Sequence, residues 1–162
     1  MDGTTRKLIT TLHVAVAVSV LGVDVVLITL GLAGYAMAPG AVYPAAQLIG
    51  RQVLWPLALA ALATGIAAAL IGPYGLFRFW WTSIKLTITL ALTGLLAFVL
   101  LPALSAAAAA AGAGEPIAGS RQLMLILGPV LSTSLLLTNI GLAVFKPKWR
   151  LSGAPRRSEV AA

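Results

Sequence analysis

The chain contains no cysteine, a single histidine and only four acidic residues in 162 positions. The absence of cysteine excludes disulfides, thiolate nucleophiles and thiolate metal sites, and it leaves the redox compartment undetermined. One histidine supplies at most one strong ligand to a haem or copper centre, so we expect no cofactor and no metal. The chain also lacks a phosphate-binding glycine loop, a Ser-His-Asp arrangement and paired carboxylates, which disfavours hydrolytic and metal chemistry.

Charge is scarce, whereas apolar residues are abundant. Charged residues make up 9% of the chain and hydrophobic residues 60%, and the mean hydropathy is +1.01. Long apolar runs in such a background indicate membrane-spanning helices. The chain has no length left for a separate soluble domain. We therefore predict an all-α fold, an integral membrane four-helix bundle with up-down topology.

Proline and glycine divide the chain into four apolar runs. The expected spans cover about 8–36, 45–72, 80–104 and 121–145. We expect Pro44 to lie in the turn between the first and second spans, and Pro56 to kink the second span. We expect Ser105–Gly119 to form a loop, whose alanines extend the third helix by one or two turns. Residues 1–145 form the transmembrane domain, and 146–162 form a basic tail that we expect to be disordered and cytoplasmic.

The distribution of positive charge predicts the orientation. Nine of the eleven Lys and Arg residues fall on one side of the predicted bundle, and only Arg51 and Arg121 fall on the other. By the positive-inside rule, both termini are cytoplasmic in a multi-pass protein of the cell membrane. Aromatic residues around Arg78 indicate a membrane–water boundary. The net charge of +7 then matches anionic headgroups rather than nucleic acid.

A cleaved signal peptide is the rival interpretation of the first run, because Ala36-Met37-Ala38 resembles a small-residue cleavage site. The apolar region is much longer than the roughly 7–15 residues of a signal-peptide core. We therefore predict that the first run is retained as a span.

Two ionisable residues lie within the first span. His13 and Asp24 share one helix face but are about 16 Å apart along the axis, so each needs its own partner. We predict that Asp24 pairs with Arg51 in the outer half of the membrane, and that His13 and Lys85 form a second polar pair nearer the cytoplasm.

Further polar residues occur on the third and fourth spans. Thr82, Lys85 and Thr89 form a stripe on the third span, and Asn139 lies near mid-membrane on the fourth, in a group that also includes Ser132, Thr133, Ser134 and Thr138. Together with Asp24, Arg51 and His13, they predict an interior polar slot that binds a ligand.

Each of these residues also has a purely structural interpretation. An Asp24–Arg51 pair can be architectural, Lys85 can extend to the headgroups, and His13 can be a hydrogen-bonded packing residue. Hydroxyl groups on helices most often bond back to their own helix carbonyls. The spacing Ala61-Gly65-Ala69 fits close helix packing, and Gly128 with Ser132 has the same interpretation.

Three functions remain open at this point. In the first, the interior site binds or relays a small or amphiphilic ligand, or protons. In the second, the protein is a membrane-embedded enzyme that acts on a lipid-soluble substrate, with Asp24 as the catalytic acid or base. In the third, it is a structural or accessory subunit that packs against a second copy or a larger membrane partner.

From about Leu12 to Leu101, the chain resembles a family of small four-span bacterial membrane proteins of unassigned function. The resemblance lies in two runs, LHVAVAVSVLGVDVVLITLGLAG and GRQVLWPLALAALATGIAAALIGPYGLFRFWWTSIKLTITLAL. The recurring residues of that pattern correspond to His13, Asp24, Arg51, Trp81 and Lys85. The resemblance implies a four-span fold and a membrane location, and it implies no activity.

Overall fold

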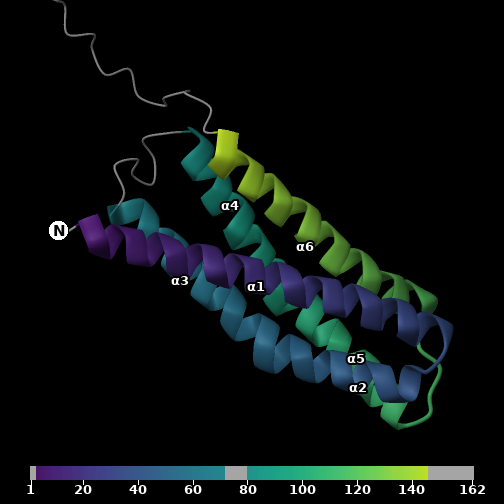
Figure 1. Cartoon of the computed structure of the whole chain (residues 1–162). Coiled ribbons are helices and arrows are strands. Elements are labelled where there is room, and N and C mark those ends of the chain that lie inside the picture. The colour runs from purple at the N-terminus through teal and green to yellow at the C-terminus, as the bar shows by residue number, and fades with distance from the viewer. Residues whose placement is uncertain (1–2, 72–79, 146–162) are drawn as a thin grey trace, which may run out of the picture.

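The computed structural model describes residues 3–71 and 80–145, and within these ranges every element is a helix (Figure 1). Four helical segments are long and apolar enough to cross a membrane: Gly3–Ala36, Pro39–Ile71, Thr82–Gly112 and Gly119–Ala143. They run alternately up and down, so the predicted all-α, four-helix architecture is confirmed. The expected tail at 146–162 and the aromatic residues at 77 and 79 lie outside the described residues.

Two of the four segments are interrupted. The elements in chain order are α1 (Gly3–Ala36), α2 (Pro39–Ile49), η1 (Gly50–Leu54), α3 (Trp55–Ile71), α4 (Trp80–Leu95), η2 (Leu96–Leu100), α5 (Leu101–Gly112) and α6 (Gly119–Phe145). We call the end of the bundle that holds Gly3, Ile71, Trp80 and Phe145 the terminal end, and the end that holds the 36–39 and 112–119 connections the loop end.

The interruptions η1 and η2 are single π-helical turns, and a proline explains each of them. Proline has no N–H and its ring collides with the carbonyl four residues earlier. Pro56 and Pro102 each follow a residue whose N–H bonds five residues back, Trp55 to the Gly50 carbonyl and Leu101 to the Leu96 carbonyl. The helix therefore continues through each proline by way of a wider turn.

At the loop end, the alanines extend the third segment to Gly112, about two turns past Leu104 as predicted, because alanine is the strongest helix former. The helix ends at Gly112, and Gly114 two residues later has a φ of 69°, the left-handed conformation that favours glycine. Pro44 lies inside α2, not in the preceding turn.

Close packing of α1 against its neighbours depends on glycine. A methyl group at Gly34 would lie 2.8 Å from Cζ of Tyr43 on α2, and one at Gly31 would lie 3.0 Å from Cγ1 of Ile126 on α6. Tyr43 is completely buried. Small residues allow helix backbones to approach closely, which is how helices associate where lipid removes the hydrophobic driving force.

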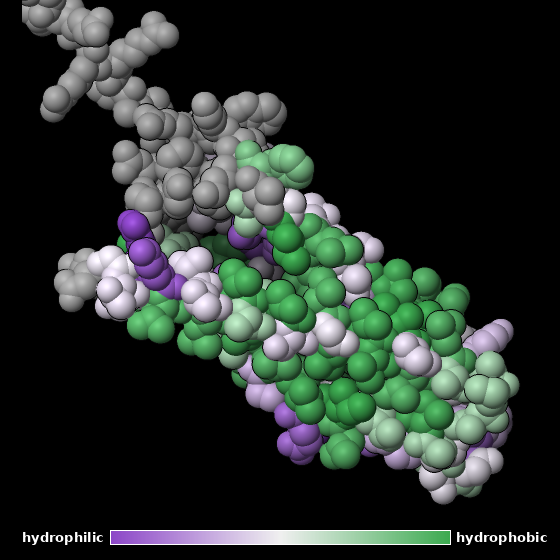
Figure 2. Space-filling model, in the orientation of Figure 1, coloured by the Kyte–Doolittle hydropathy of each residue, from purple (hydrophilic) through white to green (hydrophobic). Residues whose placement is uncertain are grey.

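The outer surface is apolar along most of its length. Figure 2 shows a predominantly hydrophobic face over the middle of the bundle, with paler and hydrophilic residues at its ends and along its lower edge. Many large apolar side chains are exposed, among them Leu12, Leu32, Leu70, Phe98 and Leu137. A continuous apolar surface of this kind on a four-helix bundle fits a multi-pass membrane protein.

Candidate functional site: an apolar cavity with a buried carboxylate

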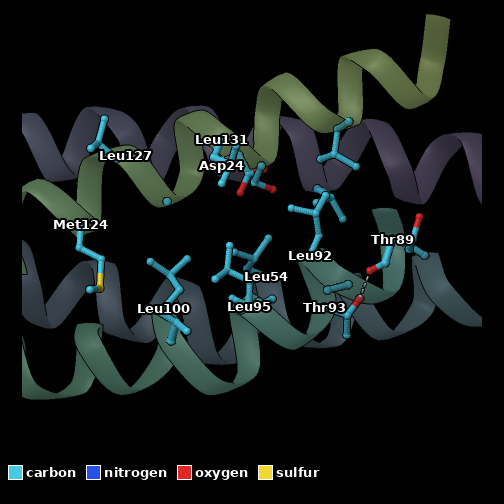
Figure 3. A pocket seen from close by; sticks show the side chains of 18 of the residues that line it. Asp24, Leu54, Thr89, Leu92, Thr93, Leu95, Leu100, Met124, Leu127 and Leu131 are labelled. Carbon is cyan, nitrogen blue, oxygen red and sulfur yellow. Dashed lines mark hydrogen bonds between the residues drawn. The ribbon is translucent and has the colours of Figure 1, made fainter. Parts of the chain in front are cut away.

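A cavity of about 420 Å³ lies between α6 and the α4–η2 segment (Figure 3). Its volume falls in the range of about 300–1,000 Å³ that is usual for small-molecule sites. The α6 residues that line it are Ser120, Leu123, Met124, Leu127, Gly128, Leu131, Ser132 and Leu136. These positions recur every three or four residues, so they form one face of the helix, about 24 Å long.

The cavity opens to the surface of the bundle along α6. Leu123, Met124, Leu127 and Leu131 line it and are each 43–54% exposed, so one long edge of the cavity is uncovered. The opposite wall and floor come from buried residues, including Leu96 and Leu100 of η2 and Leu54 of η1. Both π turns thus contribute side chains to the cavity.

Asp24 lies on the floor of this cavity. It is 1% exposed, and its side chain extends from α1 into the space between α6 and α4–η2 (Figure 3). The Ser132 side chain on α6 is a hydrogen-bond partner of the carboxyl group. The other carboxyl oxygen, Oδ2, is buried and has no hydrogen-bond partner. Buried polar atoms are normally paired, so an orphan oxygen facing a cavity indicates a place for a ligand or water.

The predicted Asp24–Arg51 ion pair is wrong. The contacts Gly34–Tyr43 and His13–Gly65 place Arg51 within about one helical turn of the depth of Asp24, so the predicted depth was reasonable. The predicted inward direction of the Arg51 side chain is wrong, because Arg51 is exposed on the outside of the bundle. Gly50 and Leu54, four residues apart, occupy the buried face of η1 and turn Arg51 outward.

Thr89, Thr93 and Asn139 form a polar row from the inner part of the cavity toward the terminal end. Asn139 Nδ2 donates to Thr89 Oγ1 over 3.4 Å, which joins α6 to α4 as part of the predicted interior polar set. Asn139 is 7% exposed and its Oδ1 atom has no hydrogen-bond partner. The stripe predicted on the third span is also inward: Thr82 is buried, and Lys85 and Thr89 are half-buried.

His13 lies in a separate contact nearer the terminal end. Its Nδ1 atom is 3.1 Å from Thr64 Oγ1, and the Thr64 hydroxyl donates to the Ala60 carbonyl over 2.6 Å. The two side chains are thus within hydrogen-bond distance of each other, and the contact joins α1 to α3. The ring packs on Gly65, where a methyl group would lie 3.0 Å from His13 Cε1. Lys85 lies close enough to act electrostatically on His13.

Sequence reasoning missed three features of the site. Thr64 was not considered as the partner of His13, and Ser132 was placed in the interior polar set and in helix packing but was not named as the partner of Asp24. The third is the pair of π turns, for which a signal exists in the repeat Val53-Leu54-Trp55-Pro56 and Val99-Leu100-Leu101-Pro102. In both copies the leucine before the X-Pro step is buried and lines the cavity.

The described residues contain no group of three His, Cys, Asp or Glu side chains that could hold a metal ion. No protein-family model matches the chain, and no curated protein or solved structure matches it. The resemblance to small four-span bacterial membrane proteins therefore stays a prediction, and the function must be argued from the cavity.

Proposed function

We propose that this protein binds an amphiphilic ligand inside the cavity between α6 and α4–η2, and that the ligand enters sideways from the lipid. The observation that carries this proposal is the unpartnered Oδ2 atom of Asp24, a residue that lines a largely apolar, open-edged cavity. An apolar wall provides affinity for a hydrocarbon chain, and a few convergent polar groups orient the head group.

The location supports a lipid-soluble ligand rather than a water-soluble one. The exposed edge of the cavity is made of leucine and methionine side chains on the apolar surface of the bundle. We further propose that the terminal end faces the cytoplasm and that the membrane is the cell membrane, because the basic residues concentrate at that end. An ionisable residue inside a membrane span is costly, and it is therefore a default candidate for function.

The test compares two glycine variants of the same helix. Gly128 lines the cavity, and a methyl group there would lie 3.3 Å from Leu100 Cδ1, whereas one at Gly141 would meet no atom within 4 Å and that residue does not line the cavity. Gly128→Leu should fill the cavity, and Gly141→Leu is the matched control. The bound molecules are identified by native mass spectrometry after gentle extraction, and thermal unfolding checks that both variants fold.

We expect a stoichiometric amphiphile on the parent protein and on Gly141→Leu, and its loss from folded Gly128→Leu. Equal retention by all three proteins would show that only surface lipid is bound, and it would overturn the proposal. A second variant, Leu96→Phe, fills the cavity from η2 and guards against an effect peculiar to Gly128, since Leu96 is 7% exposed and lines the opposite wall.

One observation favours a second candidate, an accessory subunit of a larger membrane assembly. Arg51 and Gln52 are both exposed on the outer face of η1, at about the depth of Asp24. An arginine that faces hydrocarbon costs at least about 2.5–3.5 kcal/mol, and a partner with an acidic side chain would remove that cost. Because the chain has no cysteine, a single-cysteine Gln52→Cys variant, which keeps Arg51, tests this by cross-linking in membranes. A specific protein adduct would support the assembly, and adducts with lipid alone would contradict it.

A further inference from the structure

The direction of the hydrogen bonds around the cavity restricts the head group of the ligand. Five of the side chains that line the cavity are polar: Asp24, Thr89, Thr93, Ser120 and Ser132. None of the lining residues is Lys, Arg or His. The described residues that line the cavity therefore present no positive charge, and their only side-chain donors are hydroxyl groups.

The two threonine hydroxyls donate away from the cavity. Thr93 Oγ1 donates to the Thr89 carbonyl over 2.8 Å, the bond drawn in Figure 3, and Thr89 Oγ1 donates to the Lys85 carbonyl over 2.9 Å. Thr89 Oγ1 also accepts from Asn139 Nδ2. Each hydroxyl has one proton, so these two side chains present only lone pairs to the cavity.

The two serine hydroxyl groups add little to the hydrogen-bond donors available to a ligand near Asp24. Ser132 is already the hydrogen-bond partner of Asp24. Ser120 lies at the loop-end mouth, about 18 Å from Ser132 along α6. Asp24 Oδ2 is a buried acceptor without a donor. The polar surface near Asp24 therefore consists of acceptors, and a complementary ligand must donate.

We propose that the cavity selects amphiphiles with a compact hydrogen-bond-donating head group, a hydroxyl or an amine, and rejects head groups that carry phosphate or carboxylate. This inference rests on the proposed function and names the class of ligand for the same cavity. A donor head group satisfies Asp24 Oδ2. An anionic head group would lie against a carboxyl group and threonine lone pairs with no cation among the lining residues to balance it.

Four probes of equal chain length test the selection: hexadecan-1-ol, hexadecylamine, hexadecyl methyl ether and hexadecyl phosphate. The ether keeps the oxygen of the alcohol but cannot donate, so it isolates the donor. Equimolar competition on the purified full-length protein, read by native mass spectrometry, should show the alcohol and the amine bound about tenfold more strongly than the ether or the phosphate. Asp24→Asn replaces one acceptor by a donor and should reduce the advantage of the alcohol over the ether severalfold.

Gly128→Leu separates the two proposals. If all four probes bind equally and all are displaced by Gly128→Leu but not by Gly141→Leu, the cavity binds amphiphiles and the head-group selection is overturned. Preferential binding of the phosphate or the ether also overturns the selection. If no probe responds to Gly128→Leu, the proposed function fails, and the selection fails with it.

Discussion

Two parts of the bundle pack very differently. On one side, α1 lies close to α2 and α3, with Gly34 against the ring of Tyr43 and the ring of His13 on Gly65. On the other side of the bundle, α6 and α4–η2 are separated by a cavity of about 420 Å³. A glycine on each close contact removes the methyl group that would hold two helices apart.

The facing surfaces of α4–η2 and α6 are made mainly of leucine. Gly94 on α4 has no atom within 4 Å of the position where a Cβ would lie, so no neighbouring helix packs closely against it. Long side chains on both surfaces keep the two backbones apart, and a cavity lies between them. The comparison shows glycine at the close contacts that α1 makes with its neighbours, and mainly leucine around the cavity.

The largest effect is expected from a substitution at the close contact between α1 and α2. Gly34→Ala should lower the free energy of unfolding by about 2 kcal/mol, because the new methyl group would lie 2.8 Å from a buried aromatic ring. Thermal unfolding in detergent measures this. Gly22→Ala is the control on the same helix, since no atom lies within 4 Å of its Cβ position. Equal loss in both variants would contradict close packing at Gly34.

The next prediction concerns Asp24 on the floor of the cavity. Asp24→Leu should raise the unfolding free energy of the ligand-free protein by about 1 kcal/mol, since it removes a buried oxygen that has no partner. The same change should abolish retention of the amphiphile. Ser19→Leu, at an exposed position of α1, controls for added hydrophobicity. A large loss of stability in Asp24→Leu would mean that the carboxyl group is architectural.

A smaller effect is expected at the contact between His13 and Thr64. A double-mutant cycle with His13→Ala and Thr64→Val should give a coupling of about 0.6 kcal/mol, the average for polar contacts between membrane helices. Reversible unfolding of the two single variants and the double variant supplies the numbers. Strictly additive losses would show that the 3.1 Å contact does not contribute to stability.

The smallest effect sharpens the comparison between glycines. Gly94→Ala should stabilise the protein by about 0.5 kcal/mol, because alanine is the better helix former and the added methyl group meets nothing. Gly65→Ala, measured in the same series, should instead destabilise, since its methyl group would lie 3.0 Å from His13 Cε1. Destabilisation by both variants would place a neighbour against Gly94.

Much of the fold could be predicted because it depends on composition and on length. Apolar runs between proline and glycine breakers gave four spans, and the structure has four helical segments that match them closely. The stop at Gly112–Gly114 also follows from the sequence, since a left-handed residue favours glycine. The depth of Arg51 relative to Asp24 follows from counting residues along antiparallel helices.

The direction of a side chain could not be predicted in the same way. Arg51 and Leu54 are three residues apart, and a π turn that follows from Pro56 decides which of them faces the interior. The wider turn inserts extra rotation, so a helical wheel with a period of 3.6 misplaces the residues around it. The same difficulty applies to Leu96 and Leu100 in η2, which line the cavity without any polar marker.

The sequence by itself determined that the chain forms four apolar helices and that a lone acid, Asp24, lies inside one of them, because hydropathy and helix length are local properties. Only the tertiary structure decided that Asp24 meets Ser132 instead of Arg51, and that α4–η2 and α6 remain apart. Those outcomes depend on how glycines and π turns set the distance and rotation between helices, and no single segment contains that information.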